Sequence, residues 1–388
     1  MTIVGIGLRN AWRNKIRAVL TLIGVAVAVI AFLFLRTILS AWTTGADNAA
    51  KDRLATRHKV TFVMSLPLRY VDHIRTIPGV KAASYANWFG AKNPNAEDQF
   101  FATIAVDSKT FLDVSDETVV PPDQKEHWLG DRRGAIIGDH LAKQFGWKVG
   151  DKVTLEGSIY PGDWEFVIDG IYTAARRSVD RSTFFFHWDY MNESLSAAQK
   201  DRVGWVMTRI DDPSHAADIA KRIDDSFADQ ETQTLTMSER AMNTSFLGMF
   251  SAILKAMNYV SIVILVIMGL ILGNTIAMGV RERTHEYGVL RAIGFKPKHL
   301  VAFILGEAVL IGAIGGLVGV LVAVPFINQG VGRYLEENMS GFFPYFRVAP
   351  HDAILAGLLA LGLAALVAAI PAYQASKLNT IDALRRVG

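Results

Sequence analysis

Four long apolar runs constrain this chain more than any other feature of its sequence. They lie at 18–35, about 259–280, 300–326 and 353–370. Each is close to the roughly 20 residues that an α-helix needs to cross about 30 Å of hydrocarbon. The whole chain is 51% hydrophobic and only 20% charged, which is unusual for a soluble protein of 388 residues. The sequence therefore predicts four membrane-spanning helices.

Charge divides the chain into two parts. Residues 46–245 carry 24 Lys and Arg against 30 Asp and Glu, whereas the remainder carries 16 against 7. The basic residues of the remainder gather before the first apolar run, between the second and third, and at the C-terminus. Because basic loops stay on the cytoplasmic side, we expect both termini on the cytoplasmic side of the membrane and the acidic segment on the other side.

These two patterns give an expected order of segments. The four membrane helices are expected at 18–42, 246–280, 300–326 and 352–371. On the cytoplasmic side lie an amphipathic elbow helix at 1–17, a loop at 281–299 and a tail at 372–388. On the other side lie an extracytoplasmic domain on helical stalks at 43–245 and a loop at 327–351. In the elbow, Arg9, Arg13 and Arg17 share one helical face and Trp12 lies on another. A basic flank of an uncleaved signal anchor is the alternative interpretation.

The acidic segment has the pattern of an α+β domain. Strand-helix-strand units are expected near each of its ends, around 68–88 and 205–237, with a mostly β insertion between them. We expect two subdomains, of which the first is discontinuous in sequence. The helical stalks are expected at 42–57 and 238–258, and Asp212 is expected to cap the helix of the second unit. The chain contains no cysteine, so the domain must be stabilised by its own core.

Motifs of enzyme chemistry are absent from the sequence. It has no GxxxxGK[ST] phosphate loop, no HExxH metal motif and no GxSxG nucleophile motif. We therefore expect a chain that is not an enzyme, with no catalytic residues, no metal, no cofactor and no nucleic-acid partner.

Within the apolar runs, the main signals concern helix packing. Small residues four apart allow close approach of helices, and they are Gly269 with Gly273, Gly312 with Gly316, and Gly315 with Gly319. Glu307 is an ionisable residue inside the third run. It either reaches the inner interface or makes a buried polar contact that couples helices.

The stretch "RERTHEYGVLRAIGF" at 281–295 lies between the second and third apolar runs. We expect a helix of about 13 residues that begins near Arg281 and ends at Gly294. A loop that only fixes topology would need basic residues. It would not need two glutamates, Gly288 and a defined helix end, so a docking helix is the alternative.

This stretch resembles the coupling-helix motif of the MacB, LolC/LolE and FtsX group of ABC transporter permeases. Tyr287 replaces the usual isoleucine. Other segments resemble the same group in order: "LRNAWRNKIRAVLTLIG", "ILGEAVLIGAIGGLVG", "PAYQASKLNTIDALR" and, in the acidic segment, "GAIIGDHLAKQFGWKVGDKVTL". The resemblance implies a mechanotransmission permease of the bacterial cytoplasmic (inner) membrane, without a fused ATPase domain.

Further expectations follow from this resemblance. Docking to a separate ABC ATPase, which would hold ATP and Mg, would involve Glu282, Arg283, Glu286, Gly288, Arg291 and Gly294. The permease would pair with a second permease subunit, as a homodimer or heterodimer. It would drive export with a membrane-fusion adaptor and an outer-membrane duct. Lipoprotein release and regulation of cell-wall hydrolases are the alternatives within the group.

Overall fold

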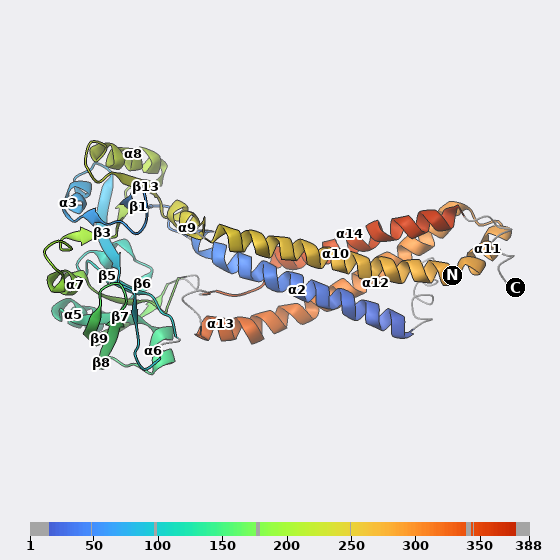
Figure 1. The fold of residues 1–388 in the computed structure, drawn as a ribbon, viewed down its shortest axis with the longest axis horizontal. Helices are drawn as coiled ribbons and strands as arrows, with labels where there is room; N and C mark the ends of the chain where they lie inside the picture. Colours follow the sequence, from blue (N-terminus) through green and yellow to red (C-terminus); the bar gives the residue numbers. More distant parts are fainter. Residues whose placement is uncertain are drawn as a thin grey trace. The chain divides into compact units, whose positions relative to one another are not determined.

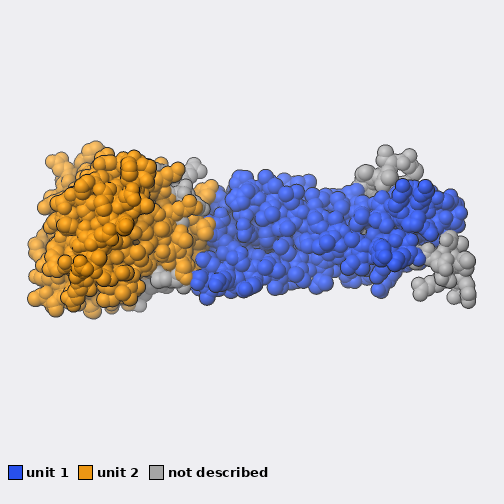
Figure 2. Space-filling model, turned by 90° about the horizontal axis from the view of Figure 1, so that it is seen from above, with its two compact units in different colours: residues 1–40, 251–333, 346–388 blue, residues 41–250, 334–345 orange. Residues whose placement is uncertain are grey.

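The computed structural model describes residues 15–47, 49–96, 99–175, 179–248, 250–338, 343 and 345–377. They form two compact units, coloured separately in Figure 2. The membrane unit is drawn from 1–40, 251–333 and 346–388, and the sheet domain from 41–250 and 334–345. Most of the expected elbow, with Arg9, Trp12 and Arg13, and the tail beyond residue 377 lie outside the described residues.

Four helices of the described chain are long and apolar enough to cross a membrane, which confirms the predicted number. They are α2 (Lys15–Asp47), α10 (Ser251–Glu282), α12 (Pro297–Pro325) and α14 (Pro350–Ser376) (Figure 1). Each begins before the apolar run that predicted it, and α2, α10 and α14 also end beyond it. Backbone hydrogen bonding continues there into polar turns that hydropathy does not count. At 33 residues, α2 is about 50 Å long, well beyond the 30 Å of hydrocarbon.

The expected loop at 327–351 is helical in its first part. After Pro325 the chain continues as a π-helical segment, η2 (Phe326–Val331), and then as α13 (Gly332–Asn338). Proline has no N–H to donate to the preceding turn, and helices adjust locally at such positions. The prediction of a loop starting at residue 327 was therefore wrong up to Asn338.

The glycines of α12 lie where neighbouring helices come closest. A Cβ on Gly312 would lie 2.6 Å from that of Ala364, and one on Gly316 would lie 2.9 Å from that of Ala360, both in α14. Gly315 and Gly319 face the other way, and a Cβ there would meet Val25 and Val29 of α2 at 2.9 and 2.7 Å. The two small-residue pairs thus serve two different helices.

The two glycines of α10, Gly269 and Gly273, differ in how closely they approach α14. A Cβ on Gly273 would lie 2.4 Å from Cγ1 of Val367, so this position requires glycine. At Gly269 the nearest contact would be an ordinary 3.5 Å. Close packing against α14 therefore depends on Gly273 rather than on Gly269.

The sheet domain is built on one mixed sheet. Its strands pair in the order β13-β1-β12-β3-β5-β10-β7-β9-β8-β4, with β6 attached to β9. The bounds are β1 Arg53–His58, β3 Val80–Trp88, β4 Ala91–Lys92, β5 Thr103–Val106, β6 Thr118–Val119, β7 Gly134–Gly138, β8 Lys152–Gly157, β9 Gly162–Ala174, β10 Phe184–His187, β12 Trp205–Ile210 and β13 Thr234–Ser238, while β2 Leu66–Pro67 and β11 Arg202–Val203 form a separate pair.

Short helices accompany the strands. They are α3 Arg69–Arg75, α4 Phe111–Val114, α5 Pro122–Gly130, α6 Asp139–Phe145, α7 Trp188–Ser194, η1 Pro213–His215, α8 Ala216–Ser226 and α9 Glu239–Gly248. The two predicted strand-helix-strand units bring α3 and α8 to the half of the sheet that contains β1, β3 and β13 (Figure 1). The predicted insertion supplies the other half. Pairing of β3 with β5 carries the sheet across the boundary between these halves.

A shared core joins the two halves. The aromatic stretch of β10 alternates, so that Phe184 and Phe186 are fully buried and Phe185 faces a smaller cluster on the opposite side. Phe186 packs edge-to-face on Phe89 and Phe166, with ring centroids 4.9 and 4.8 Å apart. Such pairs contribute beyond the area that they bury.

The predicted helical stalk at 42–57 is shorter than expected. Helix α2 ends at Asp47, and Arg53–His58 form β1, a strand buried along its whole length. Its pairing with β12 and β13 overrides the helical pattern of the sequence. On the return, α9 starts at Glu239, so the chain is helical there as expected.

Asp169 of β9 should give the sheet domain a distinctive pH dependence. Burial, together with the charge of Asp131, raises the pKa of Asp169 to about 6, against an opposing effect of His127. Between about pH 4 and pH 6 the folded state retains a proton that the unfolded state releases, so this group makes stability fall as pH rises. In Asp169→Asn we expect that contribution to vanish.

The measurement is the unfolding temperature of the full chain in detergent at several pH values from 4 to 7. The variant should gain stability relative to the wild type as pH rises through this window. A constant difference between the two proteins at all pH values would contradict the raised pKa.

Candidate functional site

The stretch at 281–295 forms two helical pieces rather than one. Helix α10 runs through Glu282, and a separate helix, α11 (Thr284–Ala292), follows a break at Arg283. The Thr284 hydroxyl donates to the carbonyl oxygens of Val280 and Arg281, which competes with regular backbone bonding at the break. The expectation of one 13-residue helix beginning at Arg281 was therefore wrong.

The expected end of that helix is present. Gly294 has φ +102°, a conformation that glycine adopts without steric cost. Its N–H donates to Arg291, and the N–H of Phe295 donates to Leu290. These two bonds form a Schellman motif, which turns the chain sharply towards α12.

One ion pair fastens this segment to α12. Arg283 Nη1 lies 2.7 Å from Glu307 Oε2, and both side chains are largely buried, with exposed fractions of 11% and 20%. Of the two possibilities for Glu307, the structure shows the polar contact between helices. The break before α11 is therefore joined to α12 by a charged contact.

Further contacts fasten the end of α10 to α2. Arg17 forms a bidentate ion pair with Glu282. One turn deeper, the hydroxyls of Thr21 and Thr275 are 2.9 Å apart and share a hydrogen bond. The segment thus connects with both α2 and α12 through charged groups.

Tyr287 fills the space beneath α11. It is 6% exposed and lines, with Thr275, Gly279 and Glu307, a cavity of about 20 Å³, enough for roughly one water. Burial and the charge of Glu307 raise the pKa of Tyr287 to about 12, so the phenol stays neutral and can donate a hydrogen bond.

The predicted docking residues therefore have different roles. Glu282 and Arg283 form pairs within the membrane unit, Gly288 is buried, Glu286 and Arg291 are half-buried, and Gly294 ends the helix. The segment also exposes large apolar side chains. Val289, Ile293 and Phe295 are 41%, 68% and 37% exposed. Sequence reasoning missed them because it weighted charge; apolar residues in an otherwise polar segment were the available signal.

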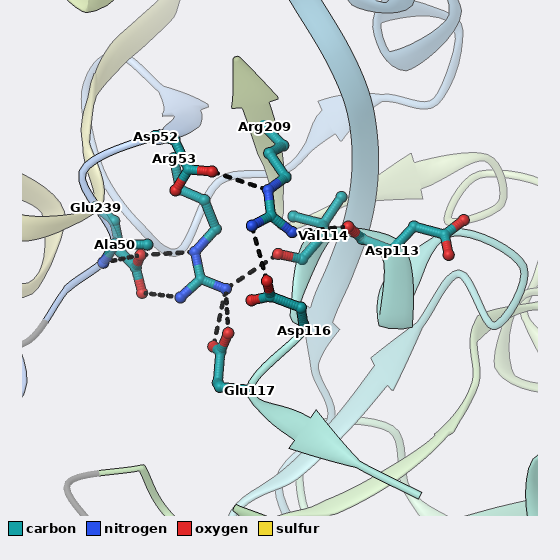
Figure 3. A network of polar contacts seen from close by, with 9 residues as sticks. All are labelled: Ala50, Asp52, Arg53, Asp113, Val114, Asp116, Glu117, Arg209 and Glu239. Atoms are coloured by element: carbon teal, nitrogen blue, oxygen red, sulfur yellow. Dashed lines mark hydrogen bonds and ion pairs between the residues drawn. The ribbon is translucent and has the colours of Figure 1, made fainter. Parts of the chain in front are cut away.

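A second polar cluster lies where the chain enters and leaves the sheet domain (Figure 3). Arg53, at the start of β1, donates to Glu239 at 2.8 Å, to Glu117 at 2.8 Å and to the carbonyl of Val114 at 3.1 Å. Glu239 also accepts the N–H of Ala50 at 3.1 Å. Burial alone would lower the pKa of Arg53, but the charges of Glu239 and Glu117 raise it.

A neighbouring arginine extends this cluster. Arg209 of β12 contacts Asp52 and Asp116, each at 2.8 Å. Figure 3 shows both guanidinium groups between the entry segment and the loop at 113–117. The start of α9 is thereby bonded to β1, which follows α2. Sequence analysis did not identify this cluster, because its members lie up to 189 positions apart.

Among the described residues, no group of three or more His, Asp or Glu could hold a metal ion. The two clusters are built from arginine–carboxylate pairs instead. Such pairs fix orientation through fork-shaped hydrogen bonding. The geometry of both sites therefore suits mechanical connection.

Two family models match the chain. Residues 18–226 match the MacB-like periplasmic core domain, and residues 258–380 match the FtsX-like permease C-terminal domain. The first match covers more than half of the 388 residues.

Several known proteins are similar to this chain. An uncharacterized ABC transporter permease of Methanocaldococcus jannaschii, MJ1507, is 21% identical over 99% of this chain and 97% of its own length. ABC transporter permease YtrF of Bacillus subtilis is 29% identical over 33% of this chain and 31% of its own length. A macrolide export ATP-binding/permease protein MacB of Nitrobacter winogradskyi is 36% identical over 29% of this chain and 16% of its own length.

Among solved structures, the periplasmic region of MacB from Actinobacillus actinomycetemcomitans is similar to this chain. The match covers 50% of this chain and 92% of that chain, with 7% identity and a TM-score of 0.37.

The chain spans nearly all of the length of MJ1507 and less than a third of the lengths of YtrF and MacB. With four membrane helices, an α+β domain between the first two and matches to both family models, the chain belongs to the MacB/FtsX-type family of ABC transporter permeases.

Proposed function

We propose that this chain is the permease subunit of an export system in which a separate ATPase chain supplies the energy. The ATPase, which holds ATP and Mg, binds α11 on the cytoplasmic side, where both termini also lie. Its closure moves α2 and α10, and these helices move the extracytoplasmic sheet domain of a permease dimer. The sheet domain then drives a substrate outward with a membrane-fusion adaptor.

The observation that carries this proposal is the attachment of α11. A loop that only fixed topology would have no need of the Arg283–Glu307 pair beneath it or of the Arg17–Glu282 pair beside it. Ion pairs that are partly withdrawn from water and hydrogen-bonded hold a definite geometry. Polar residues at the start of the 281–295 segment thus serve attachment. Its exposed apolar residues, Val289, Ile293 and Phe295, are available to the ATPase.

Substitution of that apolar side tests the docking role. In Ile293→Asp we expect the copurifying ATPase activity to fall by about 30-fold, because loss of a central interface anchor costs roughly 2 kcal/mol. Ile159→Asp is the matched control, since Ile159 is an isoleucine of the sheet domain that is 55% exposed. The measurement is ATP hydrolysis retained by the affinity-purified full chain.

Two results would count against the proposal. ATPase retention by Ile293→Asp at the wild-type level would exclude α11 as the docking surface. Absence of ATP hydrolysis from the wild-type complex purified from its own membrane would remove the ATPase partner altogether.

A further inference from the structure

The loop between β1 and β2, residues 59–65, exposes apolar side chains to an unusual degree. Val60, Val63 and Met64 are 78%, 92% and 49% exposed. The loop contains no acidic residue, and it begins with the exposed Lys59. Adjacent apolar side chains on a protein surface are typical of a contact with another molecule or with lipid.

Ring contacts connect this loop with the ends of two membrane helices. Phe62 packs edge-on against Phe246, with ring centroids 6.5 Å apart. Phe246 contacts Phe250 at 5.8 Å, and Phe250 contacts Trp42 at 6.0 Å. All four residues belong to the sheet domain unit.

The far end of this row lies at the membrane boundary. Trp42 is one residue before the end of the candidate span Lys15–Thr43, and Phe250 directly precedes α10. Aromatic side chains at the ends of membrane spans lie at the level of the lipid headgroups. The row of rings therefore leads from the loop to residues at the ends of two candidate membrane spans.

A cation–π contact fixes the loop through Phe62. The Arg57 guanidinium lies 4.1 Å from the centre of the Phe62 ring, within the range of a cation–π contact. Phe62 is accordingly only half-exposed, and the apolar residues on each side of it point outward. The exposed set is thus a feature of a fixed loop.

Lipid suits this loop better than a second copy of the chain. Three exposed apolar side chains offer far less than the roughly 800 Å² per partner that a stable protein interface needs. Exposed apolar residues beside a lysine match the chemistry of the headgroup region, where the ammonium meets phosphate. Two membrane helices already tether the domain, so a small contact is sufficient.

We infer that residues 59–65 form a membrane-surface anchor of the sheet domain. Val60, Val63 and Met64 enter the outer leaflet of the membrane, on the side where α2 and α10 connect to the sheet domain. Lys59 faces the lipid phosphates. This contact limits how far the domain can tilt relative to the membrane. The anchor requires only that α2 and α10 span the membrane, and it does not depend on which partner moves them.

The absence of cysteine from the sequence allows a direct test. The full-length variants Val63→Cys and Val149→Cys are labelled with an environment-sensitive fluorophore in vesicles of phosphatidylethanolamine and phosphatidylglycerol. Val149 is the matched control, a valine 47% exposed in the turn between α6 and β8. We expect nitroxide lipids to quench the label at 63 from a depth of about 5–10 Å, while iodide quenches only the label at 149.

Equal quenching by iodide at both positions would overturn the inference. So would a label at 63 that is protected from iodide but insensitive to nitroxide lipids, because that result indicates a second chain. Lys59→Glu in the Val63→Cys background should weaken lipid quenching in anionic vesicles, and an unchanged signal would contradict the role of Lys59.

Discussion

Replacing Glu307 with alanine should leave ATPase binding intact and remove its effect on the sheet domain. The substitution removes the Glu307 carboxylate that pairs with the Arg283 guanidinium, which is only 11% exposed. Removing one member of a buried pair costs about 3–5 kcal/mol. We therefore expect α11 to lose its attachment to α12, while the apolar docking side is unchanged.

The readout is the ATP-dependent fluorescence change of a label at Val149→Cys in the reconstituted complex. We expect this change to disappear in Glu307→Ala, with ATPase still copurifying. Glu126→Ala, an exposed glutamate of α5, is the control. The exchanged pair Arg283→Glu with Glu307→Arg should recover part of the signal, and failure of both ATPase binding and signal would indicate misfolding rather than uncoupling.

Replacing Arg53 with methionine should strongly destabilise the sheet domain. The side chain of Arg53 is 7% exposed, and the side chains of its partners Glu117 and Glu239 are each 17% exposed. Their charges would remain buried without a cation, at a cost of about 3–5 kcal/mol. For a domain of this size, that corresponds to a fall of roughly 6–20 °C in the unfolding temperature.

Arg209→Met provides the matched control for this prediction. Its partners Asp52 and Asp116 are 31% and 59% exposed, and exposed pairs contribute only about 1 kcal/mol or less. Unfolding can be followed by tryptophan fluorescence, since six of the eight tryptophans lie between residues 88 and 205. Equal destabilisation by the two variants would show that Arg53 has no special place in the cluster.

Periodic and compositional features of this chain were predictable from its sequence. Runs of apolar residues gave the four spans, because the length of a helix in lipid is set by hydrocarbon thickness. Asp212 was expected to cap the helix that follows it, and its side chain accepts the N–H of Ser214. Gly294 marked the end of α11 for the same kind of local reason, a backbone conformation that few residues adopt.

Contacts between distant residues were not predictable in this way. Glu307 stood out as an ionisable residue, but its partner Arg283 depends on how α12 folds back against the break before α11. Arg53 was assigned to a helical stalk, since only its pairing with β12 and β13 makes it a strand residue. The row of rings from Trp42 to Phe62 likewise joins segments that the sequence separates.

The chain enters the sheet at β1 and leaves it from β13, and these two strands are antiparallel neighbours. The start of β1 and the end of β13, which connect to the membrane helices, lie side by side, because Leu54 pairs with Ser238. When α2 and α10 shift together, both strands are displaced alike and the bonds between them carry no load. Opposed shifts along the strands would load all five paired positions at once, in shear. The β1–β13 pair therefore resists opposed displacement of its two connected ends more than joint displacement.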